Sequence, residues 1–201
     1  MAISSEKYIG RKFSTKFVSK NKIIDSEFIK DIITAGRKLA KYGLTPNIAG
    51  NISVRYKNGM LIKAGGCSLG KLKKDDVVMV TDYSTNKNTA YVSGLKEPSS
   101  ETPTHWRIYK NFKKVNAIVH VHDKLILKKQ RLAKKLGIKF TEKEEPYGTL
   151  KLAKQILKAL KKSNYVIIKN HGSIAVGKNL NDAVNLILLI HEYVKHQSGY
   201  R

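Results

Sequence analysis

The chain has 201 residues, of which 41% are hydrophobic and 27% are charged, a composition that fits one folded domain and excludes a disordered chain. No apolar run approaches the roughly 18 residues that a transmembrane helix needs, and we see no secretory signal, so we expect a cytoplasmic protein without a membrane partner. Lys and Arg number 39 against 15 Asp and Glu, a net charge of +24 that attracts anions, but the lysines are scattered and lack interleaved aromatic residues, which disfavours nucleic acid as the partner.

The first part of the chain divides into two segments of different character. Residues 1–24 are basic and weakly patterned, so we expect them to form an extension outside the core. A single domain should then occupy residues 25–201. It should open with a helix, capped by Asp25 or Ser26 and stopped by Gly43, because apolar residues recur there at helical spacing.

A β-hairpin is predicted next. Residues 52–56 and 60–62 have the pattern of strands, and the residues between them include the pair Asn58-Gly59. An Asn-Gly pair supplies the positive φ angles that a type I′ turn requires. Residues 77–80 should form a short buried strand.

The second half alternates helices with short strands. A helix should begin at Ser99-Ser100, with serine as its cap, and run to about Phe112. The later elements are a strand over 116–122, a lysine-rich helix from Asp123, a helix over 149–162, strands over 165–168 and 173–176, and a helix over 181–196. This order, with hairpins among the elements, predicts an α/β layered domain with a mixed or antiparallel sheet.

The triplet His120-Val121-His122 is the most informative motif. Because successive side chains of a strand alternate faces, residues 120 and 122 project from the same side and could share one metal ion. Such a pair also occurs at surfaces and in cores. Catalytic zinc needs three protein ligands, and His171, which follows an apolar strand and precedes a glycine, is the candidate third ligand or else a turn residue.

The other potential metal ligands in the sequence are set aside. Cys67 is the only cysteine, which excludes a multi-thiolate metal site and an intrachain disulfide. We interpret His105, His191 and His196 as packing or surface residues.

A second set of residues is suited to an anion. Glycine turns and helix N-termini present backbone N–H groups that hold phosphates, often together with hydroxyl groups. The segments of this kind are Gly50-Asn51-Ile52-Ser53, Gly65-Gly66 and Ser99-Ser100. Each also fits an ordinary turn. Glu101 could be a catalytic base or could complement the dipole of the helix that it begins.

Taken together, four motifs resemble the class II aldolase/adducin family, and within it the L-fuculose-1-phosphate aldolases most closely. They cover 49–55, 98–101, 119–122 and 170–172, and the resemblance extends over about residues 26–195. The family implies a single-domain, three-layer αβα sandwich with a mixed, largely antiparallel central sheet. It also implies a homotetramer.

The resemblance assigns roles to individual residues. It implies one zinc ion per subunit, held by His120, His122 and His171, and Glu101 as the catalytic acid/base. The phosphate group would be held by Asn51, Gly66, Ser99 and Ser100, with Gly65 matching the family in position only.

Three departures from the family pattern concern the substrate. A Thr-Pro-(Ser/Thr)-Gly turn is replaced by Lys63-Ala64-Gly65-Gly66, so a hydroxyl group is lost at Gly65 and Lys63 is a candidate to compensate by charge. The segment after His122 is shorter and rich in lysine. The family's C-terminal tail has only Tyr200 as a candidate counterpart.

The function that we expect is zinc-dependent cleavage of a ketose 1-phosphate, such as L-fuculose 1-phosphate, to dihydroxyacetone phosphate and an aldehyde. An L-ribulose-5-phosphate 4-epimerase-like activity is the first alternative, although those enzymes carry aspartate where Glu101 stands. A methylthioribulose-1-phosphate dehydratase-like activity is the second. A non-catalytic adducin-like or nucleic-acid-binding protein is the third.

Overall fold

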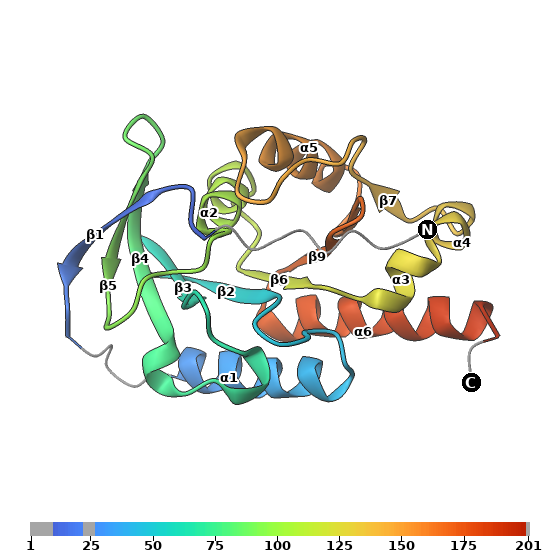
Figure 1. Ribbon diagram of the computed structural model, residues 1–201, viewed down its shortest axis with the longest axis horizontal. Helices are drawn as coiled ribbons and strands as arrows, with labels where there is room; N and C mark the ends of the chain where they lie inside the picture. Colours follow the sequence, from blue (N-terminus) through green and yellow to red (C-terminus); the bar gives the residue numbers. More distant parts are fainter. Residues whose placement is uncertain (1–9, 22–26, 200–201) are drawn as a thin grey trace.

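The computed structural model describes residues 10–21 and 27–199, and in this part of the chain a nine-stranded sheet lies between two layers of helices (Figure 1). The strand order is β1-β5-β4-β3-β2-β6-β9-β8-β7. The strands are β1 (Ser14–Ser19), β2 (Asn51–Tyr56), β3 (Gly59–Lys63), β4 (Val77–Ser84), β5 (Thr89–Ser93), β6 (Ala117–Val121), β7 (Lys139–Phe140), β8 (Tyr165–Ile168) and β9 (Gly172–Gly177).

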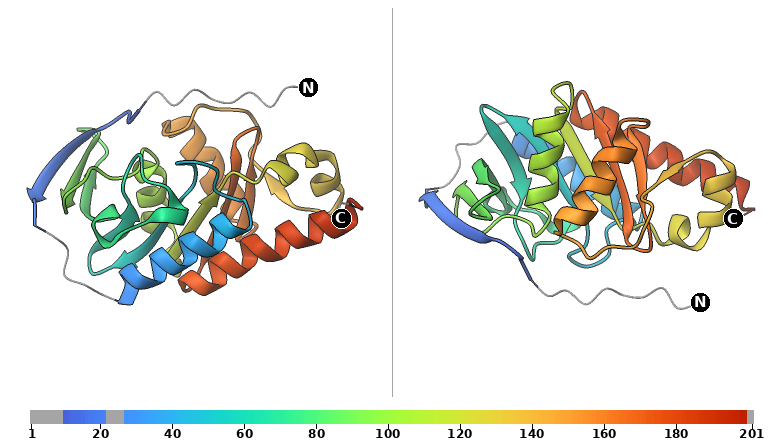
Figure 2. Two further views of the ribbon diagram at one scale, coloured as in Figure 1. Left: turned by 60° about the horizontal axis from the view of Figure 1, so that its bottom comes forward. Right: turned by 90° about the horizontal axis from the view of Figure 1, so that it is seen from above.

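Helices cover both faces of the sheet. The helices are α1 (Glu27–Lys41), α2 (Thr102–Asn111), α3 (Lys124–Lys128), α4 (Gln130–Lys135), α5 (Leu150–Leu160) and α6 (Leu180–Gln197), with 3-10 turns at η1 (Leu69–Lys71) and η2 (Lys74–Asp76). Figure 2 shows α1 and α6 side by side on one face and α2 and α5 on the other. Within the described ranges, no helix combines the length and the apolar character needed to cross a membrane.

Each face of the sheet has its own hydrophobic core, because neighbouring strand residues point in opposite directions. Val119 packs in the core under α1 and α6, together with Ile32 and Ile187. Its neighbour Ile118 packs in the core under α2 and α5. This arrangement confirms the predicted three-layer α/β fold.

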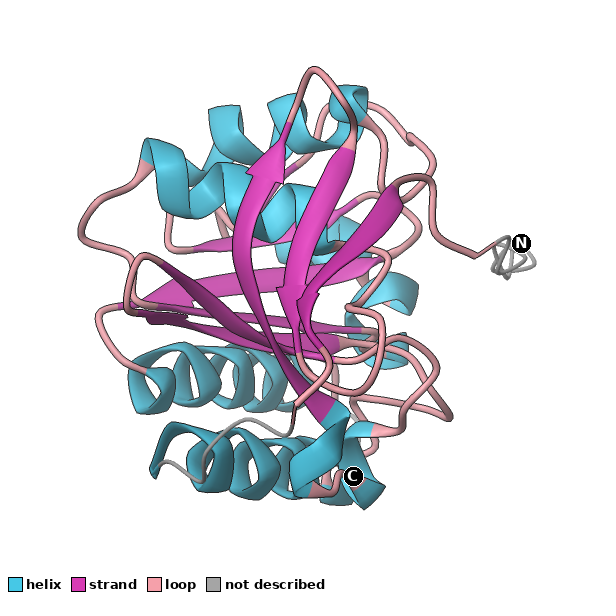
Figure 3. Ribbon diagram, turned by 90° about the vertical axis from the view of Figure 1, so that its left-hand side faces the viewer, coloured by secondary structure: helices cyan, strands magenta, loops and turns pink. Residues whose placement is uncertain are grey.

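The sheet is mixed and largely antiparallel, as predicted. The pairs β1–β5 and β7–β8 are parallel, and the other six neighbouring pairs are antiparallel. Figure 3 shows that the sheet twists strongly, so that strands at one end cross those at the other at a steep angle. Near the centre, His120 of β6 lies opposite Asn51 of β2 on one side and Ile174 of β9 on the other, which brings three strand ends to one place.

Part of the predicted N-terminal extension belongs to the sheet. Ser14–Ser19 form β1, which pairs with β5, and their side chains alternate between exposed and partly buried positions. Phe17 packs against the core while Lys16 is exposed, and exposed lysines are common on edge strands because they oppose further pairing. The expectation that the extension stays outside the core is therefore wrong for these residues. The predicted caps Asp25 and Ser26 lie outside the described residues.

Two predicted turns differ in detail from the structure. The hairpin of β2 and β3 is present, but Lys57 rather than the Asn-Gly pair adopts a positive φ of 50°. Gly59 is required for a different reason, since a Cβ atom there would lie 2.1 Å from the Val80 carbonyl oxygen of β4. At α2 the cap is Glu101 rather than a serine, although Ser99 Oγ accepts a hydrogen bond from the Glu101 N–H at 3.3 Å.

Candidate active site

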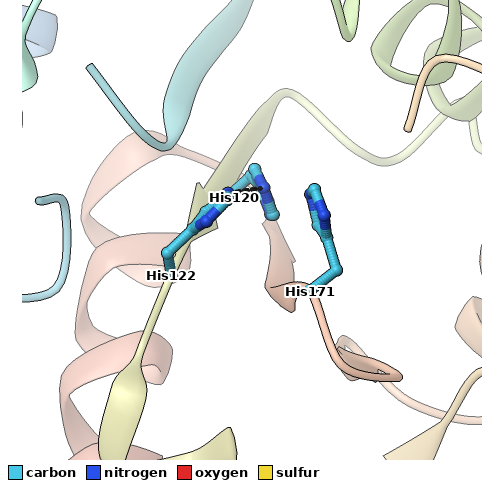
Figure 4. Close-up of side chains that lie close together, drawn as sticks. All are labelled: His120, His122 and His171. Atoms are coloured by element: carbon cyan, nitrogen blue, oxygen red, sulfur yellow. Dashed lines mark hydrogen bonds between the residues drawn. The ribbon is translucent and has the colours of Figure 1, made fainter. Parts of the chain in front are cut away.

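Three histidines converge where the central strands end. His120 is on β6, His122 directly follows it, and His171 lies in the turn between β8 and β9 (Figure 4). The Nε2 atoms of His120 and His122 are 3.0 Å apart, and one ligand atom from each of the three rings lies within 4.8 Å of the others. Asn170, which has a positive φ of 57°, makes the turn that brings His171 back over β6.

The protonation of His120 and His122 suits metal binding. His120 Nδ1 lies 2.9 Å from the Ser173 carbonyl oxygen, which can only accept, so Nδ1 carries the hydrogen and Nε2 faces His122 with a lone pair. Burial lowers the pKa of His120 and lowers that of His122 to about 3, so both rings are neutral at pH 7. A neutral imidazole fixed by a carbonyl group behind it is the usual form of a histidine ligand.

This donor set fits a divalent cation. Three neutral nitrogen ligands suit zinc and related transition metals, and three protein ligands leave a further position for water or substrate. Among the described residues this is also the one group of three or more potential ligands close enough to hold an ion. The residues that converge are those that the sequence predicted, His120, His122 and His171.

Glu101 places a carboxylate beside the three rings. It is 8% exposed; its Oε2 lies 3.4 Å from His120 Nε2, and its Oε1 lies 3.3 Å from His171 Nε2. Asn51 Nδ2 donates a hydrogen bond to Oε2 at 2.8 Å. Burial opposes ionisation, but the hydrogen bonds that the carboxylate accepts from His171 and Asn51 outweigh it, so the pKa of Glu101 lies well below its usual value. The group is a carboxylate at neutral pH.

The position of Glu101 is fixed by polar contacts between β2 and α2. Residues 51 and 53 share one face of the strand, and residues 101, 105 and 109 share one face of the helix. Beyond the Asn51–Glu101 bond, Ser53 Oγ lies 2.7 Å from His105 Nδ1 and 2.9 Å from the Tyr109 hydroxyl group. His105 is fully buried, which lowers its pKa to about 3, so it is a neutral packing residue of this contact.

The cluster lines a cavity of about 390 Å³. All nine residues singled out in the sequence line it, and they are Asn51, Gly65, Gly66, Ser99, Ser100, Glu101, His120, His122 and His171. Asn51 is 3% exposed and, within the described ranges, its Oδ1 has no hydrogen-bond partner. A buried acceptor without a partner is costly, so this atom is suited to a polar ligand.

The anion side of the cavity is built from turns. Gly66 has a positive φ of 72° and open space on its side-chain side, as a turn that receives a ligand requires. Lys63 is 3% exposed, and its Nζ donates to the carbonyl oxygens of Ile48 at 2.8 Å and Cys67 at 2.6 Å. Burial lowers the pKa of Lys63 to about 8, so it is mostly protonated at pH 7. These bonds use two of its three N–H groups.

The sequence analysis missed several residues around the site. Tyr147 and Lys124 line the cavity, and neither stood out by motif or spacing. His191 was interpreted as a packing or surface residue. Its Nδ1 lies 2.6 Å from Oδ2 of Asp123, the residue that follows His122 in the chain. Asp123 Oδ1 also caps α3, and the position of Asp123 at the start of a predicted helix was the signal in the sequence that could have identified this residue. Tyr200 lies outside the described residues.

Fold and site together define an α/β protein with a three-histidine cluster in a cavity and an adjacent buried carboxylate. The family model described as the Class II Aldolase and Adducin N-terminal domain matches residues 30–198. The chain therefore belongs to the class II aldolase and adducin family.

Known proteins similar to this chain include sugar-phosphate aldolases. An L-fuculose phosphate aldolase of Haemophilus influenzae is 31% identical over 171 residues, which cover 79% of this chain and 76% of that protein. An L-fuculose phosphate aldolase of Methanococcus maripaludis is 33% identical over 145 residues, which cover 67% of this chain and 76% of that protein. A solved L-fuculose 1-phosphate aldolase structure has a TM-score of 0.73 and 26% identity, covering 87% of this chain and 86% of that one.

Proposed function

We propose that the protein is a metal-dependent aldolase that cleaves a ketose 1-phosphate, such as L-fuculose 1-phosphate, to dihydroxyacetone phosphate and an aldehyde. The observation that carries this proposal is the Glu101 carboxylate, buried within 3.4 Å of two imidazole nitrogens of the three-histidine cluster. The L-fuculose phosphate aldolases among its relatives support the same reaction class.

His120, His122 and His171 are the residues that would hold one zinc ion per subunit. When bound, such an ion acts as a Lewis acid toward the carbonyl and hydroxyl oxygens of the substrate. Ligation by neutral imidazoles alone leaves the charge of the ion undiminished, which strengthens this effect.

Glu101 is the proposed acid/base. Because its pKa is low, it is ready as a carboxylate to take a proton from the carbon of dihydroxyacetone phosphate that becomes nucleophilic in the condensing direction. In cleavage the hydroxyl group on the carbon that becomes the aldehyde loses a proton as the carbon–carbon bond breaks, and Glu101, once it has taken up a proton, gives one to the carbon that becomes the hydroxymethyl group of dihydroxyacetone phosphate. The bond from Asn51 holds the carboxylate in position, and a positioned proton carrier contributes about 10²–10⁴-fold to a rate.

The phosphate group would lie where two turns and the start of α2 line the cavity. Gly65 lines the turn, Gly66 offers its backbone N–H group, and Ser99 and Ser100 offer hydroxyl groups at the start of α2. Lys63 adds a positive charge that burial leaves poorly screened. Binding at the phosphate fixes the distant reacting carbons, so remote binding energy supports orientation.

Parallel incubations with three sugar phosphates separate this function from its alternatives. Purified, zinc-supplemented protein is mixed with L-fuculose 1-phosphate, and dihydroxyacetone phosphate is measured with a coupled assay. Its formation supports the aldolase. With L-ribulose 5-phosphate, an isomeric sugar phosphate with an intact carbon chain would indicate an epimerase, and with methylthioribulose 1-phosphate, loss of water would indicate a dehydratase. No conversion of any of the three sugar phosphates would indicate a non-catalytic or nucleic-acid-binding protein.

The proposal includes a homotetramer in the cytoplasm. Light scattering on the purified protein tests the assembly, and a mass of one chain would contradict it.

A further inference from the structure

The segment that precedes β1 lies against the wall of the cavity. The Tyr147 hydroxyl group donates to the Gly10 carbonyl oxygen at 3.1 Å, and Lys12 Nζ donates to the Tyr147 carbonyl oxygen at 2.9 Å. The Lys12 Nζ also lies 4.5 Å from the centre of the Tyr147 ring. Since Tyr147 lines the cavity, residues 10–12 belong to the shell of the site although they are far from it in sequence.

Between these anchors, Arg11 reaches the glycine turn. A Cβ atom built on Gly65 would lie 3.4 Å from Arg11 Nη1 and 3.3 Å from the Pro98 carbonyl oxygen. The guanidinium group thus borders the space that a side chain at position 65 would fill. Gly65 itself lines the cavity.

The second guanidinium nitrogen of Arg11 is engaged by an acidic neighbour. Arg11 Nη2 forms an ion pair with Glu97 Oε2, and the Glu97 carbonyl oxygen accepts from the Gly65 N–H at 3.0 Å. An unpaired carboxylate here would repel a phosphate. Arg11 neutralises it, and its Nη1 remains directed at the glycine turn.

We propose that Arg11 contacts the phosphate group of the bound sugar phosphate through Nη1, at the corner of the cavity where Gly65 offers no side-chain hydroxyl group. Arginine stays protonated at any pH of interest, and its planar group of N–H donors matches phosphate oxygens. The ligand class is a phosphate monoester. The inference rests on the proposed function only in that the cavity receives a phosphorylated ligand.

A binding experiment with glycerol 3-phosphate tests the contact without requiring catalysis. Calorimetry compares the natural protein with Arg11→Gln and with Lys16→Gln, a matched loss of one positive charge at an exposed position of β1. The loss of a hydrogen bond to a charged group predicts a Kd about 10- to 100-fold higher for Arg11→Gln. Lys16→Gln should stay within about twofold, because it changes only the screened field. Equal Kd values for the natural protein and Arg11→Gln, or no binding by the natural protein, would overturn the proposal.

A double variant separates direct contact from masking of Glu97. If Arg11 only neutralises this carboxylate, Arg11→Gln combined with Glu97→Gln should recover the natural affinity, and that recovery would contradict the contact. Binding that stays weak in the double variant supports it. Melting temperatures of all variants establish that each is folded.

Kinetics keep the contact distinguishable from the aldolase reaction. With L-fuculose 1-phosphate, Arg11→Gln should raise KM by a similar factor and leave kcat within about threefold, the pattern of lost uniform binding. If the natural enzyme cleaves the sugar phosphate and Arg11→Gln does so with the same KM, the inference about Arg11 is wrong and the proposed function stands. If the protein binds glycerol 3-phosphate through Arg11 but releases no dihydroxyacetone phosphate, the contact of Arg11 stands and the proposed aldolase function is wrong.

Discussion

The two sides of the cavity are built in different ways. On the metal side, the side chains of His120 and Glu101 are buried and that of His122 is partly buried, and their positions follow from the central strands and the start of α2. On the phosphate side, the groups are mostly turns and helix-start backbone from segments distant in sequence, with Lys63 held by two carbonyl groups. Metal binding therefore depends on a few irreplaceable atoms, whereas phosphate binding is distributed over many hydrogen-bond donors. Substitutions should cause complete loss on one side and partial loss on the other.

The largest effect is expected from His120→Ala. Removal of this ligand leaves two imidazoles, so the protein should lose nearly all bound zinc, and aldol cleavage should fall to background. Elemental analysis and a coupled assay measure both quantities. The control is His196→Ala, at an exposed position of α6, which should retain metal and activity. Stoichiometric zinc in His120→Ala would contradict the assignment of the metal side.

A smaller, graded effect is expected from Lys63→Met. Loss of the buried charge should raise KM about 10- to 100-fold, the range for a charged hydrogen bond, with a smaller change in kcat. Because the pKa of Lys63 is lowered to about 8, the natural enzyme should bind phosphate well below that pH, and KM should rise as the pH increases through it. The variant should show no such rise. A natural KM that is constant from about pH 7 to 9 would show that this charge does not bind substrate.

A stability effect is expected from His191→Leu, next to the metal side. Asp123 is 2% exposed, and loss of its hydrogen-bond donor should lower the free energy of unfolding by about 1–3 kcal/mol. The hydrogen bond with Asp123 raises the pKa of His191. The stabilisation is therefore complete below the unfolded pKa of about 6.5 and is lost as the pH rises through the raised folded pKa.

Denaturant unfolding at two pH values measures this linkage. The difference between the natural protein and His191→Leu should be larger at about pH 6 than at about pH 9. The opposite order would show that His191 is not protonated against Asp123.

The smallest effect is expected from salt, because the scattered lysines create a field rather than a pocket. Raising the salt from about 0.1 M to about 1 M shortens the Debye length from about 10 Å to about 3 Å and should raise KM by about two- to fivefold. The kcat should change little, since the buried groups are screened much less. A collapse of kcat with salt would indicate that surface charge supports the chemistry itself.

The difference between the two sides also explains what the sequence could predict. Alternation along a strand was enough to place His120 and His122 on one face, and apolar spacing predicted α1, α5 and α6. The edge strands β1 and β7, and β5 next to β1, were missed, because Lys, Ser and Thr residues obscure their short alternation and pairing partners are distant. The position of His171 after an apolar strand and before a glycine made it a candidate third ligand, and the resemblance to the family was needed to prefer this interpretation over an ordinary turn histidine.

Contacts between distant segments could not be predicted from the sequence, because no local pattern indicates them. The bond between Asn51 and Glu101 joins residues 50 positions apart, and the bond between Lys12 and Tyr147 spans 135 positions. The lowered pKa of Lys63 likewise results from burial, which only the assembled fold produces. Sequence reasoning could identify the residue types of the phosphate side but not how they meet.

The central claim is that the three histidines hold the ion while Glu101 moves the proton, and Glu101→Gln tests it most directly. The substitution preserves size and removes the group's ability to take up and release a proton, so zinc content measured by elemental analysis should stay at about one ion per chain while kcat falls about 10²–10⁴-fold. If the carboxylate only complemented the helix dipole, Glu101→Gln would lower the free energy of unfolding by about 0.3–1 kcal/mol and leave activity intact. Near-normal aldol cleavage by Glu101→Gln would contradict the catalytic role, and loss of its zinc would place Glu101 among the metal ligands instead.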